Sequence, residues 1–192
     1  IWQASQELQL VSSAEGPLQW ILGAYYYTEN GDQARYIPIF KPSPLALLAG
    51  GEVNTDAYAL YGHVDYELAS RLTLALGARY SVDERKSSDF LAVTGTPLDG
   101  TSSGKASWDA ATWDATLSYK PAEGAMAYLR VARGFKSGGF NTGSLQQQPF
   151  NPEYILSWEA GYKASLFDRR MRLSAVAFYN DYDDLQVTQV QG

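Results

Sequence analysis

The sequence of 192 residues contains no cysteine, which excludes a disulfide framework and any metal site built on thiolates. Its one histidine, His63, has no second histidine at a ligand spacing, so the residues predict no zinc site. Charged residues make up only 19%, below the roughly 25% of an average globular protein. The formal net charge of −6 argues against a nucleic-acid partner, because phosphate binding needs a clustered excess of lysine and arginine.

Long uninterrupted hydrophobic runs are also missing. Hydrophobic residues make up 45% of the chain, yet no run approaches the ~20 residues that a membrane helix needs. Aromatic residues reach 14%, with 14 tyrosines, which is typical of rings at a membrane interface. This combination fits a surface with lipid on one side and water on the other. The chain begins without a start methionine or signal peptide and ends in a polar run, which predicts a piece of a longer protein.

Patterns of catalytic or ligand-binding residues are weak. Asp181, Asp183 and Asp184 lack the glycine and the distal glutamate of a calcium-binding loop. The glycine-containing run 134–139 has the spacing of neither phosphate-binding motif. A nucleophilic triad needs a partnered histidine, and the sequence marks no partner for His63. The sequence therefore predicts no catalytic residue, no metal, no cofactor and no enzyme activity.

The strongest pattern is alternation with a period of two, which is typical of a strand with two different faces. It is cleanest between residues 71 and 83. One parity there is apolar and consists of Leu72, Leu74, Leu76, Ala78, Tyr80 and Val82. The other parity consists of Arg71, Thr73, Ala75, Gly77, Arg79, Ser81 and Asp83. We expect the first set to face lipid and the second to face a barrel lumen.

Similar runs elsewhere predict eight strands, at about 3–13, 18–29, 57–68, 71–83, 109–120, 125–135, 154–165 and 171–187. Eleven residues at ~3.3 Å each, tilted near 45°, rise about 26 Å, close to the apolar band of an outer-membrane barrel. Short turns at 14–17, 69–70, 121–124 and 167–169 alternate with long segments at roughly 30–53, 86–108 and 136–153. The predicted fold class is therefore all-β, with antiparallel up-and-down transmembrane strands that form about eight strands of a larger barrel.

Tyrosines and charged residues support this orientation. Tyr58 and Tyr66 lie at opposite ends of one apolar parity, as two interfacial girdles require. We expect Tyr26 and Tyr80 in the outer girdle and Tyr119 in the inner one. The opposite parity supplies the candidate lumen-lining residues, which are Arg71, Arg79, Arg130, Glu159 and Lys163, together with Asp65, Glu67, Arg85 and Asp114.

One segment resembles a known family. The run 133–141 is followed by Asn151-Pro152-Glu153, by the run 158–163 and by the run 178–187, in an order and spacing that closely resemble the second half of the barrel in TonB-dependent receptors. The motif residues are Arg133, Gly134, Phe135, Gly138, Gly139 and Phe140. The short run 5–11 resembles a mid-barrel strand of the same family.

The resemblance implies that residues 1–192 are part of one TonB-dependent receptor β-barrel domain of about 22 strands, without its plug domain. It implies a receptor in the bacterial outer membrane that takes up a scarce nutrient such as a ferric siderophore. The implied partners are the TonB complex, which acts through the missing plug region, a ferric siderophore or similar ligand, and outer-membrane lipid.

Alternation alone leaves other functions open. A passive porin needs no plug, so plug-like sequence upstream of Ile1 in the parent gene distinguishes it from the receptor. A small eight-stranded outer-membrane barrel with a structural or adhesive role requires pairing between the first and last strands. A soluble binding barrel turns the face of Leu72, Leu74 and Leu76 inward.

Overall fold

The structure is a computed structural model that describes residues 1–13, 15–39, 45–143, 145 and 148–187. The described residues form eight strands: β1 Trp2–Val11, β2 Leu18–Pro38, β3 Ala46–Ala69, β4 Leu72–Val93, β5 Asp99–Tyr119, β6 Ala125–Lys136, β7 Glu153–Leu166 and β8 Met171–Asp183. Each strand pairs antiparallel with the next along the chain. The predicted all-β, up-and-down fold is confirmed. None of the described segments is a helix long and apolar enough to cross a membrane.

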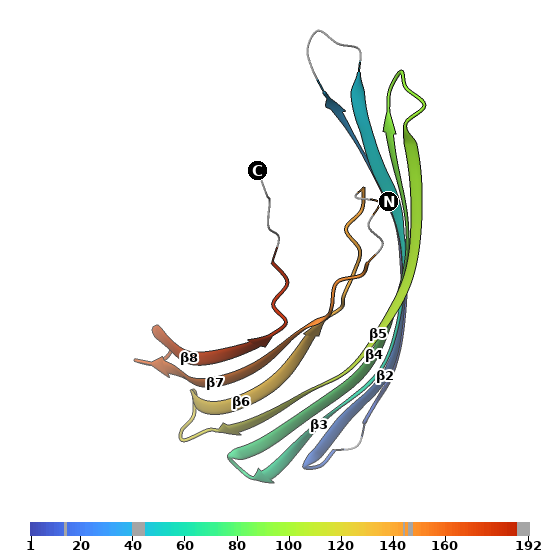
Figure 1. The fold of residues 1–192 in the computed structure, drawn as a ribbon. Coiled ribbons are helices and arrows are strands. Elements are labelled where there is room, and N and C mark those ends of the chain that lie inside the picture. Colours follow the sequence, from blue (N-terminus) through green and yellow to red (C-terminus); the bar gives the residue numbers. More distant parts are fainter. Residues whose placement is uncertain (14, 40–44, 144, 146–147, 188–192) are drawn as a thin grey trace.

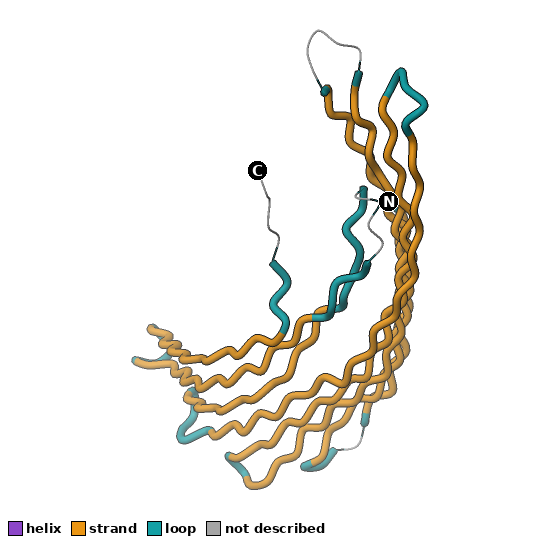
Figure 2. The backbone as a smooth tube through the Cα atoms, viewed as in Figure 1, coloured by secondary structure: helices purple, strands orange, loops and turns teal. Residues whose placement is uncertain are grey.

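The strands form one curved sheet with a concave and a convex face (Figures 1 and 2). The paired ends of β2–β3 and β4–β5 project well beyond those of β6, β7 and β8 (Figure 1). Within the described residues, β1 and β8 are the two edges of the sheet and do not pair with each other. This open arrangement does not favour a small closed barrel of eight strands.

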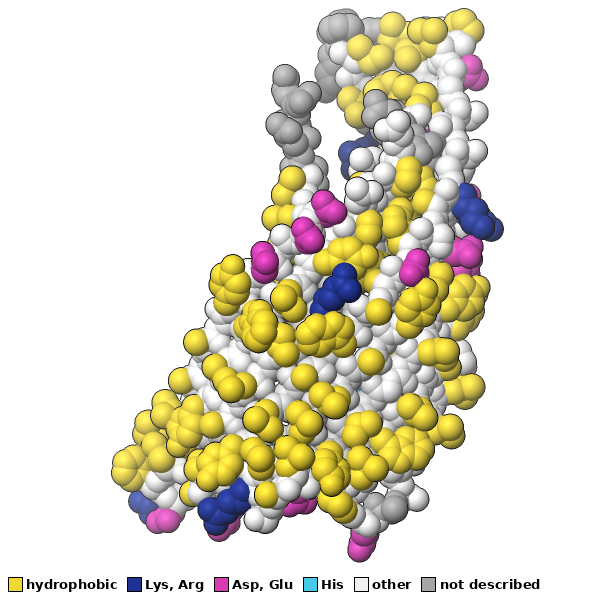
Figure 3. Space-filling view, turned by 60° about the horizontal axis from the view of Figure 1, so that its bottom comes forward, with side chains coloured by type: hydrophobic (Ala, Val, Ile, Leu, Met, Phe, Trp, Pro, Cys, Tyr) yellow, Lys and Arg dark blue, Asp and Glu magenta, His cyan; other side chains and the backbone are white. Residues whose placement is uncertain are grey.

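Antiparallel partners place their side chains on the same face, so the register assigns each residue to a face. Leu76 lies opposite Val64 on β3 and Ala115 on β5, and the row continues with Val131 and Trp158. This apolar parity covers the convex face, where hydrophobic side chains dominate the surface (Figure 3). Because the convex side chains have no second layer over them, Leu60, Leu76 and Leu129 are 67%, 45% and 62% exposed.

Tyrosines mark both ends of this apolar band. Tyr26 of β2 is the register partner of Tyr58 of β3, with ring centres 5.1 Å apart, and Tyr80 of β4 lies two residues from the register partner of Tyr58. The hydroxyls of Tyr26 and Tyr80 donate to Asp56 and Asp109, which lie farther out on the same face. Tyr66, Tyr119 and Tyr162 lie on the convex face towards the opposite end. The rings therefore occupy the positions expected for two interfacial girdles.

Two of the three predicted long loops are wrong. Most of the segments 30–53 and 86–108 is strand, since β2 continues to Pro38, β3 begins at Ala46, β4 continues to Val93 and β5 begins at Asp99. Beyond the tyrosines polar residues occupy both faces and apolar residues gather in short runs such as 46–49 and 90–93, so the hydrophobic alternation disappears although the backbone ladder continues. The amide of Asn30, for example, donates to that of Asn54 over 2.7 Å on paired strands.

The remaining connections follow the prediction more closely. Residues 137–152 link β6 to β7 as a long segment, whereas residues 12–17, 70–71, 120–124 and 167–170 form the short connections at the opposite end. Gly124 has a φ of +78°, a conformation that favours glycine over other residues in a tight turn. The last strand ends at Asp183 and not at residue 187 as predicted; residues 188–192 lie outside the described part of the chain.

Candidate functional site

Polar and aromatic side chains gather on the concave face around Arg79 of β4. The guanidinium carbon of Arg79 lies 5.3 Å from the ring centre of Tyr25 and 5.9 Å from that of Tyr61, which places the cation against two ring faces. The hydroxyl of Tyr61 donates to the carboxylate of Glu7, and the amide of Gln9 donates to Tyr61 over 2.7 Å. Four adjacent strands therefore contribute to one cluster, which we call the Arg79 cluster.

A second concave cluster, the Arg130 cluster, spans β5, β6 and β7. The Nε atom of Arg130 lies 3.9 Å from a carboxylate oxygen of Asp114. On the same strand as Arg130, Tyr128 donates its hydroxyl to Glu159 over 2.5 Å. The ammonium of Lys163 lies 5.7 Å from the ring centre of Tyr128. Glu159 is the register partner of Arg130, so acid and base alternate across neighbouring strands.

Each cluster is built on a tyrosine that lies across a glycine of the adjacent strand. Tyr61 is the register partner of Gly23, and Tyr128 is the register partner of Gly161. A Cβ atom on either glycine would collide with the tyrosine ring. The missing side chain thus lets each ring lie flat against the wall. The hydroxyl of Tyr61 reaches across β2 to Glu7 on β1, and the hydroxyl of Tyr128 reaches Glu159 on the adjacent strand β7.

These concave interactions contribute little to stability. The side chains of Arg130 and Asp114 are 45% and 31% exposed, and ion pairs that water reaches contribute about 0–1 kcal/mol. His63 lies on the same face with its Nε2 atom 3.4 Å from Asp65, in an equally open position. We therefore interpret the two clusters as a surface that is available for contact with another molecule.

The segment after β6 folds back over the concave side (Figure 1). Gly138 and Gly139 are buried there, and Gly139 forms a β-bridge with Phe150. Phe140 packs edge-on against Trp108 of β5, with ring centres 6.3 Å apart. A Cβ atom on Gly138 would collide with the indole of Trp108, so only glycine allows this close approach.

The structure places four of the predicted lumen-lining residues on the concave face and a fifth, Arg71, in a turn. Arg79, Arg130, Glu159 and Lys163 lie on the concave face, which is the lumen side if the wall closes into a barrel. That closure stays a prediction. Arg71 lies instead in the β3–β4 turn, where its guanidinium donates to the carbonyl of Pro121 over 2.8 Å.

The six motif residues are also divided between the two faces. Arg133 and Phe135 end β6 on the convex face, and Gly134 lies between them on the concave face. Gly138, Gly139 and Phe140 belong to the folded-back segment.

Sequence reasoning missed the tyrosines of both clusters and the β1 residues Glu7 and Gln9. It assigned tyrosines only to interfacial girdles, whereas Tyr61 shares its parity with His63 and Asp65 on the same strand. That shared parity was the available signal. Within the described ranges no group of three or more acidic, histidine or cysteine side chains is placed to hold a metal ion.

Comparisons with known proteins agree with this geometry. A family model for the TonB dependent receptor-like β-barrel matches residues 2–192. The pesticin receptor of Yersinia pestis is 26% identical over 149 residues, which cover 76% of this chain and 22% of that protein. The chain therefore spans about a fifth of the length of the curated relatives that it matches.

Two solved structures share the fold. The ferric yersiniabactin uptake receptor FyuA from Yersinia pestis matches with a TM-score of 0.81 and 22% identity, over 96% of this chain and 29% of that one. The open form of the ferric-catecholate import receptor Fiu from E. coli K12 matches with a TM-score of 0.73 and 18% identity, over 95% of this chain and 30% of that one.

Proposed function

The chain belongs to the family of TonB-dependent receptor-like β-barrels, and from this membership we propose that its parent protein imports a scarce nutrient across the bacterial outer membrane. The family match over residues 2–192 is the observation that carries the proposal. Residues 1–192 would then form part of the barrel wall, with the convex face in the lipid and the concave face towards a plug domain. The relatives of this chain are receptors and not enzymes, and the parent is proposed as a transporter.

We propose a ferric siderophore as the transported ligand. FyuA and Fiu are both described as receptors for iron chelates, and their barrels superpose on nearly the whole chain. The concave face offers cations, acids and tyrosine rings in two clusters, a chemistry that suits contact with a polar plug and with a charged chelate. The Arg79 and Arg130 clusters include five of the nine residues that the sequence assigned to the lumen, namely Arg79, Arg130, Asp114, Glu159 and Lys163.

The proposed partner is the TonB complex, which would act on the plug and not on this wall. A plugged barrel blocks free diffusion, and the outer membrane has no supply of ATP, so work must come from the energised inner membrane. Uptake should therefore stop when either TonB or the inner-membrane potential is removed. A passive porin has no such requirement.

The test uses the full-length receptor in cells that lack other receptors for the same ligand. Uptake of radioactive iron bound to a siderophore is measured with and without TonB, and with and without a protonophore. We expect saturable uptake only in energised cells that contain TonB. Equal uptake in all conditions, rising linearly with concentration, would overturn the proposal in favour of a porin. Failure of every siderophore tested, with TonB-dependent uptake of another nutrient, would overturn only the ligand.

A further inference from the structure

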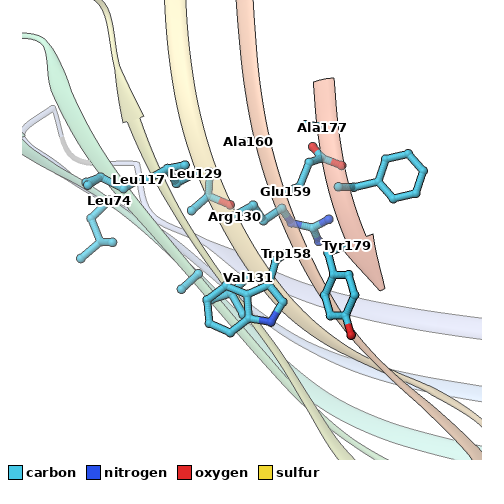
Figure 4. Close-up of a pocket in the computed structure, with 13 residues that line it drawn as sticks. Leu74, Leu117, Leu129, Arg130, Val131, Trp158, Glu159, Ala160, Ala177 and Tyr179 are labelled. Carbon is cyan, nitrogen blue, oxygen red and sulfur yellow. The ribbon is translucent and has the colours of Figure 1, made fainter. Parts of the chain in front are cut away.

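The convex face carries an apolar groove of about 580 Å³ that crosses β4 to β8. Its floor consists of the small side chains Ala115, Ala160 and Ala177, and the large side chains of Leu117, Leu129 and Trp158 rise around them. Ala160 is the register partner of both Leu129 and Ala177, so the groove follows directly from alanines placed on adjacent strands. Figure 4 shows these residues, with Arg130 and Glu159 directed to the other side of the sheet.

A second groove of about 590 Å³ continues this surface towards the short turns. It shares Leu117, Leu129, Ala160 and Ala177 with the first groove and ends near Tyr119 and Tyr162. The shared residues make the two grooves one elongated apolar depression. It extends along the strands from Tyr119 and Tyr162 to Trp158 and Tyr179, which is the direction in which an acyl chain lies in a membrane.

An arginine lies at the outer end of this depression. Arg133 is on the same strand and face as Val131, which lines the groove, but two residues farther out. It is exposed, and its guanidinium carbon lies 4.7 Å from the ring centre of Tyr154. Its Nη1 atom reaches the carbonyl of Ala111 over 3.4 Å.

In the described part of the chain no carboxylate forms an ion pair with Arg133. Asp181 lies on the same face but two strands away, about 9.6 Å at ~4.8 Å per strand. Lys105, another outward cation, already pairs with Glu84 over 3.2 Å. Arg133 thus presents unpaired donors just outward of the groove, and a guanidinium fork matches the oxygens of a phosphate.

We propose that Arg133 and this depression form a binding site for one phosphate-bearing membrane lipid. The guanidinium and the ring of Tyr154 hold the headgroup, and an acyl chain lies over Ala160 between Leu129 and Trp158. The inference rests on the proposed placement of the convex face in lipid. It does not rest on the ligand that the receptor transports or on TonB.

The test is native mass spectrometry of the full-length receptor, delipidated in detergent and titrated with phosphatidylglycerol. We expect Arg133→Gln to weaken retention of the first lipid at least tenfold and Arg133→Lys to restore part of it. Ala160→Phe should weaken retention to a similar degree, because it fills the floor of the groove from an exposed position. Diacylglycerol, which has the chains without the phosphate, should be retained at least tenfold less well than phosphatidylglycerol.

Lys105→Gln is the control, since Lys105 is a cation on the same convex face that already pairs with Glu84 and lines neither groove. The Lys105→Gln receptor should retain phosphatidylglycerol as well as the unchanged receptor does. Equal retention by the Arg133→Gln and Lys105→Gln receptors, with both shown to be folded by their heat-resistant migration in gels, would overturn the site. Siderophore uptake is measured separately in cells, so a result that overturns the proposed transport function does not change the interpretation of lipid retention.

Discussion

A single charge on the convex face should destabilise the barrel much more than the same charge one residue away. Leu76 is the residue of choice, because it lies four positions from Tyr80 and four from Leu72, the register partner of Tyr119. At ~3.3 Å per residue and a tilt near 45°, Leu76 is about 9 Å from each girdle and therefore near the bilayer midplane. An arginine at that depth on the lipid face costs about 2–4 kcal/mol.

The matched control is Ala75→Arg. Ala75 faces the concave side, and its register partners are Asp65 and Thr116. An arginine there has water and a carboxylate within reach, and an exposed pair of this kind contributes about 0–1 kcal/mol of stabilisation. Leu76→Ala is a second reference, since it removes the leucine without adding a charge. Subtracting its effect isolates the cost of placing the cation in lipid.

The measurement is reversible unfolding of the full-length receptor in lipid vesicles, followed by tryptophan fluorescence against urea. Relative to Leu76→Ala, the Leu76→Arg receptor should lose about 2–4 kcal/mol, which is roughly a 30- to 700-fold change in the folding equilibrium at 1.4 kcal/mol per factor of ten. Ala75→Arg should stay within about 1 kcal/mol of the unchanged receptor. A loss for Ala75→Arg as large as that for Leu76→Arg would refute the assignment of the two faces.

Three further predictions use the same wall. Because the chain has no cysteine, single cysteines can be labelled with a membrane-impermeant maleimide, and Leu74→Cys should react more slowly than Arg79→Cys; the reverse order contradicts the orientation. Gly138→Val should make the segment 137–152 more accessible to protease, because the valine side chain collides with Trp108. Gly31→Ala, which has open space around it, should not change cleavage, and equal cleavage rates for the two variants would contradict the packing of this segment against β5. Residues 1–192 alone should aggregate in detergent, since β1 and β8 leave unpaired edges; a monodisperse, heat-resistant species would favour the small closed barrel.

The sequence was sufficient for the fold wherever one face of a strand is apolar and the other is polar. Between the girdles the convex residues are mostly apolar, so alternation identifies both the strand and its faces, as in residues 71–83. Beyond Tyr58 and Tyr80 apolar and polar residues no longer alternate: convex side chains such as Glu52 and Lys86 are charged, and apolar residues gather in short runs near the strand ends. The backbone ladder continues there without that alternation, which is why the segments 30–53 and 86–108 were expected to be loops.

The concave clusters could be predicted only in part, for a different physical reason. Alternation reports a residue's parity, and the strand register places Arg79, Arg130, Glu159 and Lys163 on one face; that this face lines a lumen stays a prediction. Which of them meet depends on the register between strands, and no single strand encodes that register. The pairing of Tyr61 with Gly23 and of Tyr128 with Gly161 depends on it, so the glutamate contacts of both tyrosines became visible only in the structure.

The motif from Arg133 to Phe140 shows how one continuous segment acquires two separate roles. Alternation at the end of β6 turns Arg133 and Phe135 to the convex face, and the chain then leaves the strand and folds inward at Gly138 and Gly139. The wall of the sheet therefore lies between the guanidinium and the buried glycines. Substitutions at Arg133 should change lipid retention without exposing the inner segment to protease, and substitutions at Gly138 should do the reverse. A single variant that changed both would mean that the two ends of the motif act as one site.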